Sequence, residues 1–404
     1  MTKESFRTME NMQSVFADGS VMIFLKGRVD STNAGEAEEE ILKILDGHPG
    51  AALILDADGL EYISSAGLRV LLRLKKRIED LSILNVRPDV YEVFDMTGFT
   101  EMMKIEKAYR RLSVEGCEVI GEGANGKVYR LDPETIIKVY KSNDALFAIK
   151  RERELARKAF VLGIPTAIPY DVVRVGDNYG SVFELLKSRS FAKLLRETPE
   201  KRDELIEMSV GLLRKIHAVE LPMGELPDRK KVAYKWTEIF EGHLPDEIYL
   251  KLRDLIAAIP DNAHMLHGDY HMKNIMFQDG EACLIDMDTL SQGDPIFEFM
   301  GIYSAYVGFN ELDHTISQSF LGIPFETSQY IFEQTLRLYV GTDDEAVLQH
   351  AHDSVELLGH VRVMSRAWRR RLAGLESHDE QIAFSTARLL KLVPALDRLS
   401  LTLD

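Results

Sequence analysis

Two short segments decide the fold of the larger part of the chain: His267–Asn274 (HGDYHMKN) and Leu284–Asp288 (LIDMD). Asp269 offers a carboxylate that can accept a proton from an attacking hydroxyl group. Asn274 and Asp286 offer oxygen atoms suited to Mg²⁺, which takes few protein ligands and leaves room for phosphates and water. Phosphoryl transfer depends mostly on positioning and charge neutralisation, and these residues supply both. The two segments therefore favour phosphoryl-transfer chemistry.

A glycine-rich segment lies further toward the N-terminus. Gly121, Gly123 and Gly126 fit the pattern G-x-G-x-x-G-x-V. The residues that follow, 128–131, read as a strand and not as a helix, which favours a glycine hairpin over a ligand and argues against a dinucleotide-binding turn. Lys138 lies in the next apolar strand pattern, where an ammonium group could pair with phosphate oxygens.

The ammonium group of Lys138 would itself need a carboxylate to orient it. Glu152 and Glu154 both fall on a helix predicted over 145–160. Either could face the lysine, or both could be solvated helix charges. We expect Glu154 to be the partner.

Residues 115–404 resemble the aminoglycoside phosphotransferase and choline kinase-like superfamily, which has the protein-kinase-like fold. Its H-G-D-x-H-x-x-N motif is matched by His267–Asn274, and its I-D-x-D and G-D-P segments by Ile285–Asp288 and Gly293–Pro295. Two residues depart from the pattern: Lys273 stands where a small residue is usual, and Glu298 replaces the common Asp after G-D-P.

The resemblance implies a role for each matched residue. Asp269 would be the catalytic base, and Asn274 and Asp286 would hold Mg²⁺. The remaining positions would bind ATP. The three glycines and Lys138, with Glu154 as its partner, would contact the phosphates. Glu184 and Leu186, in the segment Phe183–Leu186, would form the adenine-contacting hinge between an N-lobe (about 115–187) and a C-lobe (about 188–404).

Three further candidates receive structural interpretations. His217 falls in a helix pattern of the family and is expected to be structural. His271 is expected to shape its loop and not to transfer protons. The basic run around Trp368, which comprises Arg366, Arg369, Arg370 and Arg371, invites an anionic-substrate interpretation. Because such a run wraps round several helix faces, a solvated surface is the favoured interpretation.

The first 110 residues predict an α/β unit. Apolar runs at 21–26, 51–55 and 81–86 have the length of buried strands, with helix patterns at 36–45, after Gly67 and over 91–103 between or behind them. Residues 10–108 resemble the STAS domain of anti-sigma-factor antagonists, through Leu53–Leu60 and Tyr62–Leu68. We therefore expect an α/β STAS domain (1–110) followed by an α+β two-lobed protein-kinase-like domain (115–404).

Ser64 and Ser65 lie where a helix is expected to begin. Serine at such a place is usually an N-cap, although a phosphate there would also be favoured by the helix dipole. The resemblance implies that Ser65 is a regulatory phosphorylation site, while Ser64 stands where many antagonists have Asp.

Composition limits the partners. The chain has 404 residues, 45% of them hydrophobic and 28% charged, and a formal net charge of −16, so broad nucleic-acid binding is disfavoured. We expect neither a membrane span nor a signal peptide. Cys117 and Cys283 match no metal or disulfide spacing, which favours a reducing cytoplasm.

The leading hypothesis is an ATP- and Mg²⁺-dependent phosphotransferase that acts on a hydroxyl of a small molecule, joined to a STAS module that binds a protein partner. Two alternatives stay open: a nucleotide-sensing signalling protein with a weak or inactive kinase-like domain, and a protein serine kinase.

Overall fold

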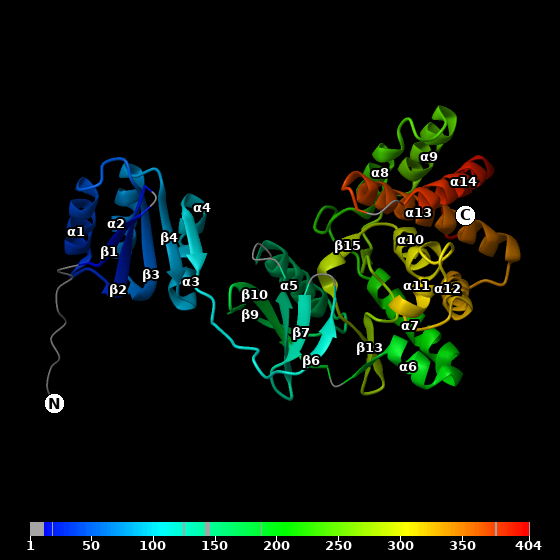
Figure 1. Ribbon diagram of the computed structural model, residues 1–404, viewed down its shortest axis with the longest axis horizontal. Coiled ribbons are helices and arrows are strands. Elements are labelled where there is room, and N and C mark those ends of the chain that lie inside the picture. The colour runs from blue at the N-terminus through cyan, green and yellow to red at the C-terminus, as the bar shows by residue number, and fades with distance from the viewer. Residues whose placement is uncertain are drawn as a thin grey trace. The chain divides into compact units, whose positions relative to one another are not determined.

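The computed structural model describes residues 12–17, 19–123, 126–141, 146–186, 188–375 and 378–403. The chain divides into two compact units (Figure 1). The first comprises Met1–Ser113 with Val173–Gly176, and the second Val114–Val172 with Asp177–Asp404. Each unit has its own hydrophobic core, the first between residues 21 and 103 and the second between residues 155 and 399.

The first unit is built on one sheet with the strand order β1-β2-β3-β4-β5. Strand β1 is antiparallel to β2, and the pairs from β2 to β5 are parallel, as expected for a sheet whose strands alternate with helices. The strands are β1 (Ser14–Ala17), β2 (Ser20–Val29), β3 (Ala52–Ile63), β4 (Leu81–Val86) and β5 (Lys104–Lys107), and the helices are α1 (Ala34–Asp46), α2 (Ser65–Arg77), α3 (Pro88–Met96) and α4 (Phe99–Met102).

The helix predicted over 91–103 is wrong in one respect, because it is divided into α3 and α4. Gly98 separates them with φ 75°, a left-handed conformation that glycine adopts without strain. Ile23 on β2 and Leu55 on β3 are fully buried, which explains why the apolar runs of the sequence located the central strands, and Phe94 of α3 is buried in the same core.

The N-lobe of the second unit is a sheet with the order β6-β7-β8-β10-β9, accompanied by one long helix, α5 (Leu146–Val161). Its neighbouring pairs from β6 to β8, and β8 with β10, are antiparallel. The strands are β6 (Val119–Glu122), β7 (Gly126–Arg130), β8 (Thr135–Tyr140), β9 (Pro169–Val175) and β10 (Asn178–Glu184).

The C-lobe is mainly helical, and its central hairpin delivers the two decisive segments. Strand β13 (Ile275–Gln278) begins directly after Asn274, and β14 (Glu281–Leu284) ends just before Asp286. A short strand, β11 (Arg189–Ser190), pairs with β13, and β12 (Met265–Leu266) pairs with β15 (Ser291–Gln292). The hairpin therefore brings Asn274 and Asp286 to the same end of one small sheet.

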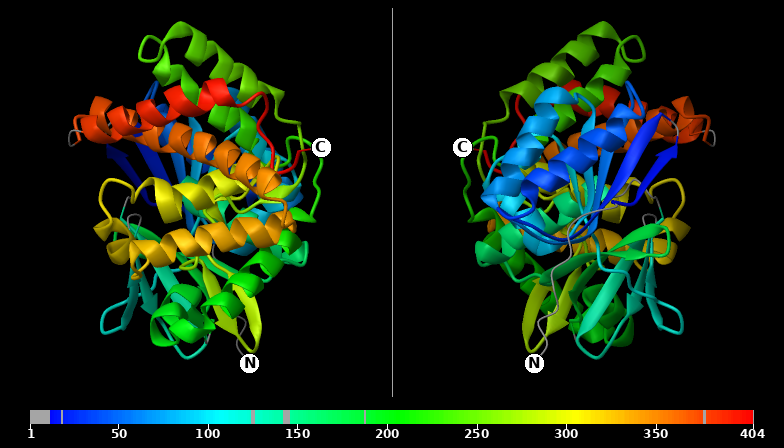
Figure 2. Two further views of the ribbon diagram at one scale, coloured as in Figure 1. Left: turned by 90° about the vertical axis from the view of Figure 1, so that its right-hand side faces the viewer. Right: turned by 90° about the vertical axis from the view of Figure 1, so that its left-hand side faces the viewer.

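Helices of the C-lobe contact this hairpin, α6 through β13 and α7 through β14. Helices α13 and α14 lie side by side (Figure 2). The helices are α6 (Phe191–Glu197), α7 (Arg202–His217), α8 (Arg229–Trp236), α9 (Asp246–Ala258), α10 (Ile296–Tyr303), α11 (Thr315–Phe320), α12 (Phe325–Val340), α13 (Glu345–Leu372) and α14 (Asp379–Ala395). No helix among the described residues is both long enough and apolar enough to cross a bilayer.

Candidate active site

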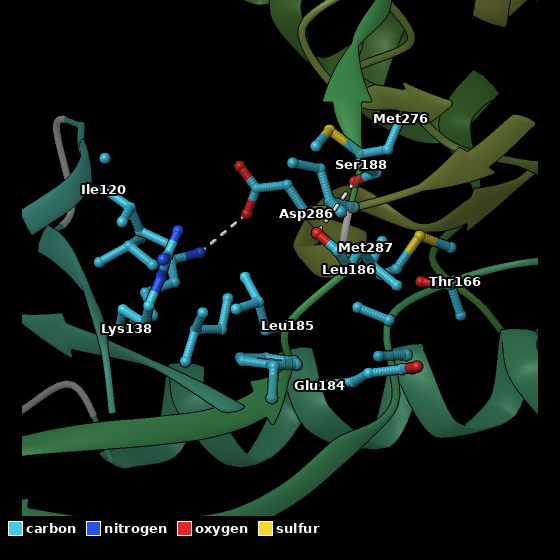
Figure 3. Close-up of a pocket in the computed structure, with 18 of the residues that line it drawn as sticks. Ile120, Lys138, Thr166, Glu184, Leu185, Leu186, Ser188, Met276, Asp286 and Met287 are labelled. Atoms are coloured by element: carbon cyan, nitrogen blue, oxygen red, sulfur yellow. Dashed lines mark hydrogen bonds and ion pairs between the residues drawn. The ribbon is translucent and has the colours of Figure 1, made fainter. Parts of the chain in front are cut away.

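A cavity of about 810 Å³ lies within the second unit, between the N-lobe sheet and the start of the C-lobe (Figure 3). Its volume is in the range typical of cofactor pockets. Most of its wall is apolar. The charged groups of Lys138, Glu152 and Asp286 lie together in one part of the cavity, which we call its polar end. The apolar side chains include Ile120, Val128, Ile136, Leu185, Met276 and Met287. Such a pocket suits a flat apolar ring with a charged group attached to it.

Lys138 is held at the polar end of this cavity by two carboxylates. Its Nζ lies 2.9 Å from Glu152 Oε1 and 2.8 Å from Asp286 Oδ1. Burial by itself lowers the pKa of Lys138, but the charges of Glu152 and Asp286 outweigh it, and the pKa lies above its ordinary value. The ammonium group is therefore charged and fixed in place.

The expectation that Glu154 pairs with Lys138 is wrong, because Glu152 does so. On α5, Glu152 shares one face with the buried residues Ile149 and Ala156, whereas Glu154 is exposed. The i, i+3, i+7 spacing of this buried face was readable in the sequence and would have selected Glu152. The hydroxyl of Tyr140 also donates to Glu152, at 2.5 Å, which orients the carboxylate.

The glycine-rich segment lies between β6 and β7, next to the cavity, which Gly121 and Val128 line. A Cβ on Gly126 would overlap the carbonyl oxygen of Val139 on β8, so this position requires glycine for close strand packing. Gly121 and Gly123 have no such close neighbour, and Gly121 lines the cavity. The tip of the loop, residues 124–125, lies outside the described residues.

The predicted hinge segment follows β10 along the cavity wall. Glu184 and Leu186 both line the cavity. The amide of Glu184 donates to the carbonyl of Ile168 at 3.0 Å, and the amide of Leu185 donates to the carbonyl of Glu134 at 2.7 Å. These bonds fix the backbone of the segment between the two lobes.

The loop that carries Asp269 is anchored by a buried carboxylate. Glu298 is fully buried and accepts hydrogen bonds from the amides of His267 (2.5 Å) and Gly268 (2.9 Å). His217 Nε2 lies 3.7 Å from the same carboxylate, so this histidine supports the loop from behind. Glu298, which stands where the family pattern has Asp, therefore still supplies a carboxylate that anchors the loop.

Gly268 cannot be replaced without moving the loop. Its φ of 84° lies in the left-handed region, and a Cβ would overlap the carbonyl oxygen of Thr289. The hydroxyl of Thr289 donates to the carbonyl of His267 at 2.8 Å, and His267 Nε2 lies 3.2 Å from the carbonyl of Ile285. The loop of Asp269 and the loop of Asp286 are thus held against each other by these two contacts.

The carboxylate of Asp269 is partly exposed and surrounded by donors. His271 Nε2 lies 3.4 Å from Oδ2, Asn274 Nδ2 lies 3.5 Å from Oδ2, and Arg362 Nη2 lies 3.8 Å from Oδ1. Burial alone would raise the pKa of Asp269, but His271, Arg362 and His267 outweigh it, and the pKa lies below its ordinary value. Asp269 is therefore ionised and can accept a proton or a hydrogen bond from a hydroxyl.

Asp286 adopts a backbone conformation that is rare for a residue other than glycine. Its φ is 63° and its ψ is 63°, in the left-handed region. Short polar residues tolerate this region, and such outliers cluster at functional sites. In this conformation the carboxylate extends into the polar end of the cavity, where Figure 3 shows it bonded to Lys138.

Three carboxylates gather beside Lys138. Glu152, Asp286 and Asp288 each offer an oxygen atom within 4.8 Å of the others. Burial and the charges of Asp286 and Glu152 raise the pKa of Asp288 to about 7. The amide of Ile285 donates to the carbonyl of Asn274 at 3.0 Å, which places Asn274 beside this group. Such a group of oxygen atoms suits Mg²⁺, and Asp288, which the sequence interpretation did not select, lies among them.

Residues 116–325 match the phosphotransferase enzyme family, which is more than half of the chain. The chain belongs to the phosphotransferase enzyme family. The solved structures to which it is similar share little sequence with it. ADP-bound aminoglycoside phosphotransferase APH(2'')-Ib is 16% identical, covers 68% of this chain and 92% of its own, and has a TM-score of 0.46. A choline/ethanolamine kinase family protein from Mesorhizobium loti is 13% identical, covers 68% and 87%, and has a TM-score of 0.47.

The N-terminal part of this phosphotransferase is a STAS domain, since residues 11–112 match that family. BtrV of Bordetella bronchiseptica, a candidate anti-sigma factor antagonist, is 36% identical over 92 residues, which are 22% of this chain and 78% of BtrV. The STAS and phosphotransferase families thus account for the two halves of the expected fold.

In the STAS domain, the two serines at the start of α2 have different surroundings. The hydroxyl of Ser64 caps the helix and accepts from the amides of Ala66 (3.2 Å) and Gly67 (3.4 Å). Ser65 is the first residue of the helix and is exposed. A Cβ on Gly67 would meet Ile63 and Val29 at 3.1 Å or less, so the turn packs closely on the sheet. Ser64 therefore holds the turn while Ser65 remains accessible.

Proposed function

We propose that this protein transfers the γ-phosphate of ATP, in the presence of Mg²⁺, to a hydroxyl group of a small molecule. The observation that carries the proposal is the arrangement of Lys138, held between Glu152 and Asp286 at the end of a large cavity, with the ionised Asp269 on the adjoining loop. Membership of the phosphotransferase family supports the same reaction.

Each residue contributes a separate part of the reaction. The apolar cavity and the backbone at Glu184 and Leu186 bind the base, while the hairpin of Gly121, Gly123 and Gly126 covers the phosphates and Lys138 pairs with their oxygens. Asn274 and Asp286, with Asp288 beside them, would hold Mg²⁺, which would supply positive charge to neutralise the phosphates. Asp269 orients the acceptor hydroxyl and accepts its proton as the oxygen attacks phosphorus.

The variant Asp269→Asn tests this assignment. Asn keeps the size of the side chain but removes the charge that attracts the proton, so we expect turnover to fall by roughly 10²- to 10⁴-fold. ADP binding, measured by isothermal titration calorimetry, should stay close to wild type because the cavity is unchanged. Full turnover by Asp269→Asn, measured as ATP consumption with a panel of hydroxyl-bearing metabolites, would remove Asp269 as the base.

We further propose that the STAS domain binds a protein partner and that phosphorylation of Ser65 controls this binding. The exposure of Ser65 at the first turn of α2 and the similarity to BtrV support the proposal. A phosphate there would be favoured by the helix N-terminus and would add up to two negative charges to the surface.

Two measurements test the role of Ser65. Mass spectrometry after incubation with ATP and Mg²⁺ should detect a phosphate on Ser65 if the phosphotransferase domain modifies it, and an unmodified Ser65 counts against self-modification. Ser65→Asp and Ser65→Ala should differ in partner binding. If both variants keep wild-type partner binding and wild-type transfer, Ser65 has no regulatory role.

A further inference from the structure

A group of arginines lies next to Asp269, on two helices that are far apart in sequence. Arg362, Arg366 and Arg369 follow one another at i, i+4 and i+7 on α13 and therefore share one helix face. Helix α8, which carries Arg229, packs against α13 (Figure 1). Trp236 at the end of α8 lies between them: the guanidinium carbons of Arg229 and Arg369 are 5.4 and 5.6 Å from its ring centroid. We call these four arginines the arginine cluster.

Two members of the arginine cluster reach the catalytic loop itself. Arg362 Nη2 lies 3.8 Å from Asp269 Oδ1, and Arg229 Nη2 donates to the carbonyl of Gly268 at 3.3 Å. Arg362 Nη1 and Arg229 Nε are buried and have no hydrogen-bonding partner among the described residues. Buried donors are almost always paired in folded proteins, so these two atoms beside the loop of Asp269 are donors left for a ligand or an ordered water.

The arginine cluster carries more positive charge than nearby carboxylates neutralise. Asp269 and Glu298 are the carboxylates that act on Arg362 and Arg229, and Glu298 is already bonded to two backbone amides. Burial and the charge of Arg229 lower the pKa of Arg362 to about 10, and burial together with Arg370 and Arg369 lowers the pKa of Arg366. The chain as a whole has a net charge of −16, so the positive charge of the arginine cluster is a local feature of this part of the molecule.

We propose that the acceptor of this phosphotransferase carries an anionic group, a phosphate or a carboxylate, which the arginine cluster binds while the acceptor hydroxyl faces Asp269. The inference rests on the proposed function and adds the substrate class to it. Guanidinium groups bind both anions through paired hydrogen bonds, and packing on Trp236 limits the freedom of Arg229 and Arg369. The same charges repel a polycationic acceptor such as an aminoglycoside.

The described residues that line the nucleotide cavity do not include these arginines, so the two sites can be tested separately. The full chain is first titrated with ADP and Mg²⁺, and then, at saturating ADP and constant ionic strength, with inorganic phosphate, succinate or gentamicin. The test variant is the double substitution Arg366→Gln and Arg369→Gln, chosen because both side chains are exposed and their truncation leaves the core intact. Arg371→Gln is the matched control, because Arg371 lies on the same helix but pairs with Asp379 at 2.8 Å.

We expect inorganic phosphate or succinate to saturate the wild-type protein, to bind at least about tenfold more weakly to the double variant, and to bind Arg371→Gln as tightly as wild type. Binding of phosphate without binding of succinate would identify an acceptor that carries a phosphate. Binding of succinate without binding of phosphate would identify an acceptor that carries a carboxylate, such as a hydroxy acid. The inference is overturned if the wild type binds neither anion at millimolar concentration, if the double variant binds them equally well, or if gentamicin binds more tightly than both. Loss of ADP binding with anion binding retained would instead contradict the proposed function and leave the anion site standing.

Discussion

Lys138 has two carboxylate partners that come from different parts of the phosphotransferase domain. Glu152 belongs to α5 of the N-lobe and Asp286 to the loop after β14 of the C-lobe. The side chain of Glu152 is 6% exposed and that of Asp286 is 42% exposed, so the first partner is a fixed support and the second is open to exchange. At the scale of the residue, the ammonium group of Lys138 therefore has one buried partner, Glu152, and one accessible partner, Asp286.

The first prediction concerns the buried partner. Glu152→Gln removes the charge that orients Lys138, so we expect kcat/KM for ATP to fall by about 10- to 100-fold, the range for loss of a hydrogen bond to a charged group. Glu152→Asp should recover part of the loss, which distinguishes positioning of the lysine from damage to the fold. Glu154→Gln on the exposed face of the same helix should behave as wild type, and equal losses in the two Gln variants would contradict the assignment.

The second prediction concerns a buried carboxyl group in the C-lobe. Burial, followed by the neighbouring charge of Glu356, raises the pKa of Glu311 to about 7, although Arg388 Nη2 lies 3.4 Å away. Between about pH 4.5 and 7 the folded protein therefore keeps a proton on Glu311 that the unfolded chain releases, and this contribution to stability is lost as the pH rises through 7. His360 faces the same carboxyl at 3.5 Å and has a pKa lowered by burial to about 3, so it stays neutral in this window.

Glu311→Gln should remove this pH dependence. Relative to wild type, the free energy of unfolding of the variant should increase by about 1 to 3 kcal/mol between pH 5 and pH 8. Both tryptophans, Trp236 and Trp368, lie in the second unit, so their fluorescence during urea unfolding follows the relevant transition. Parallel pH profiles for wild type and Glu311→Gln would contradict the prediction, and the exposed Glu333→Gln serves as the control.

At the scale of the element, the loop that carries Asp269 is defined by its close approach to a second loop. The loop of His267–Asp269 contacts the segment 285–289 through Thr289 and Ile285, and Glu298 on α10 holds it from the opposite side. Because Gly268 combines a left-handed φ with the absence of a Cβ, the approach depends on a single residue type.

The third prediction follows from this contact. Gly268→Ala would place a methyl group against the carbonyl of Thr289 and strain the backbone, so we expect transfer activity to fall at least about 100-fold, since small displacements of catalytic groups are costly. Gly211→Ala on α7 is the matched control, because nothing lies near its Cβ position and alanine stabilises a helix by about 0.5 to 1 kcal/mol. Near-normal activity of Gly268→Ala would show that the loop is less tightly constrained than its geometry indicates.

Local patterns predicted the elements that they directly encode. The runs at 21–26 and 81–86 marked buried strands, and the HGDYHMKN and LIDMD segments marked the loops around one hairpin. The strands β1 and β5 were missed because short edge strands carry little apolar pattern. Glu154 was preferred over Glu152 because the buried face of α5 was not used. The sequence alone marks Arg366 and Arg369 of the arginine cluster but favours a solvated surface for them. The sequence does not show that α8 and α13 are neighbours, and this contact is what brings Arg229 to the same place.

At the scale of the whole molecule, the two units have separate hydrophobic cores. The core of the STAS domain is formed by residues between 21 and 103, and that of the phosphotransferase domain by residues between 155 and 399. Stability that depends on apolar burial is therefore local to each unit.

The fourth prediction is that each unit unfolds in its own transition. Leu55→Ala, in the centre of β3, leaves a cavity in the STAS core and should destabilise that unit by about 3 kcal/mol. Calorimetry should show one transition lowered, while tryptophan fluorescence, which reports on the other unit, should keep its wild-type midpoint. A common shift of both signals would mean that the two cores unfold cooperatively.

The ion pair between Lys138 and Asp286 has a consequence for affinity. Phosphate oxygens that approach Lys138 must compete with the carboxylate of Asp286 and are also repelled by it. Under the proposed function, Asp286 would therefore oppose nucleotide binding when no cation is bound, although the proposed transfer requires this residue. Neutralising this one side chain in Asp286→Asn should tighten binding of metal-free ADP and abolish turnover, so that the enzyme's affinity and its rate respond in opposite directions to the same substitution.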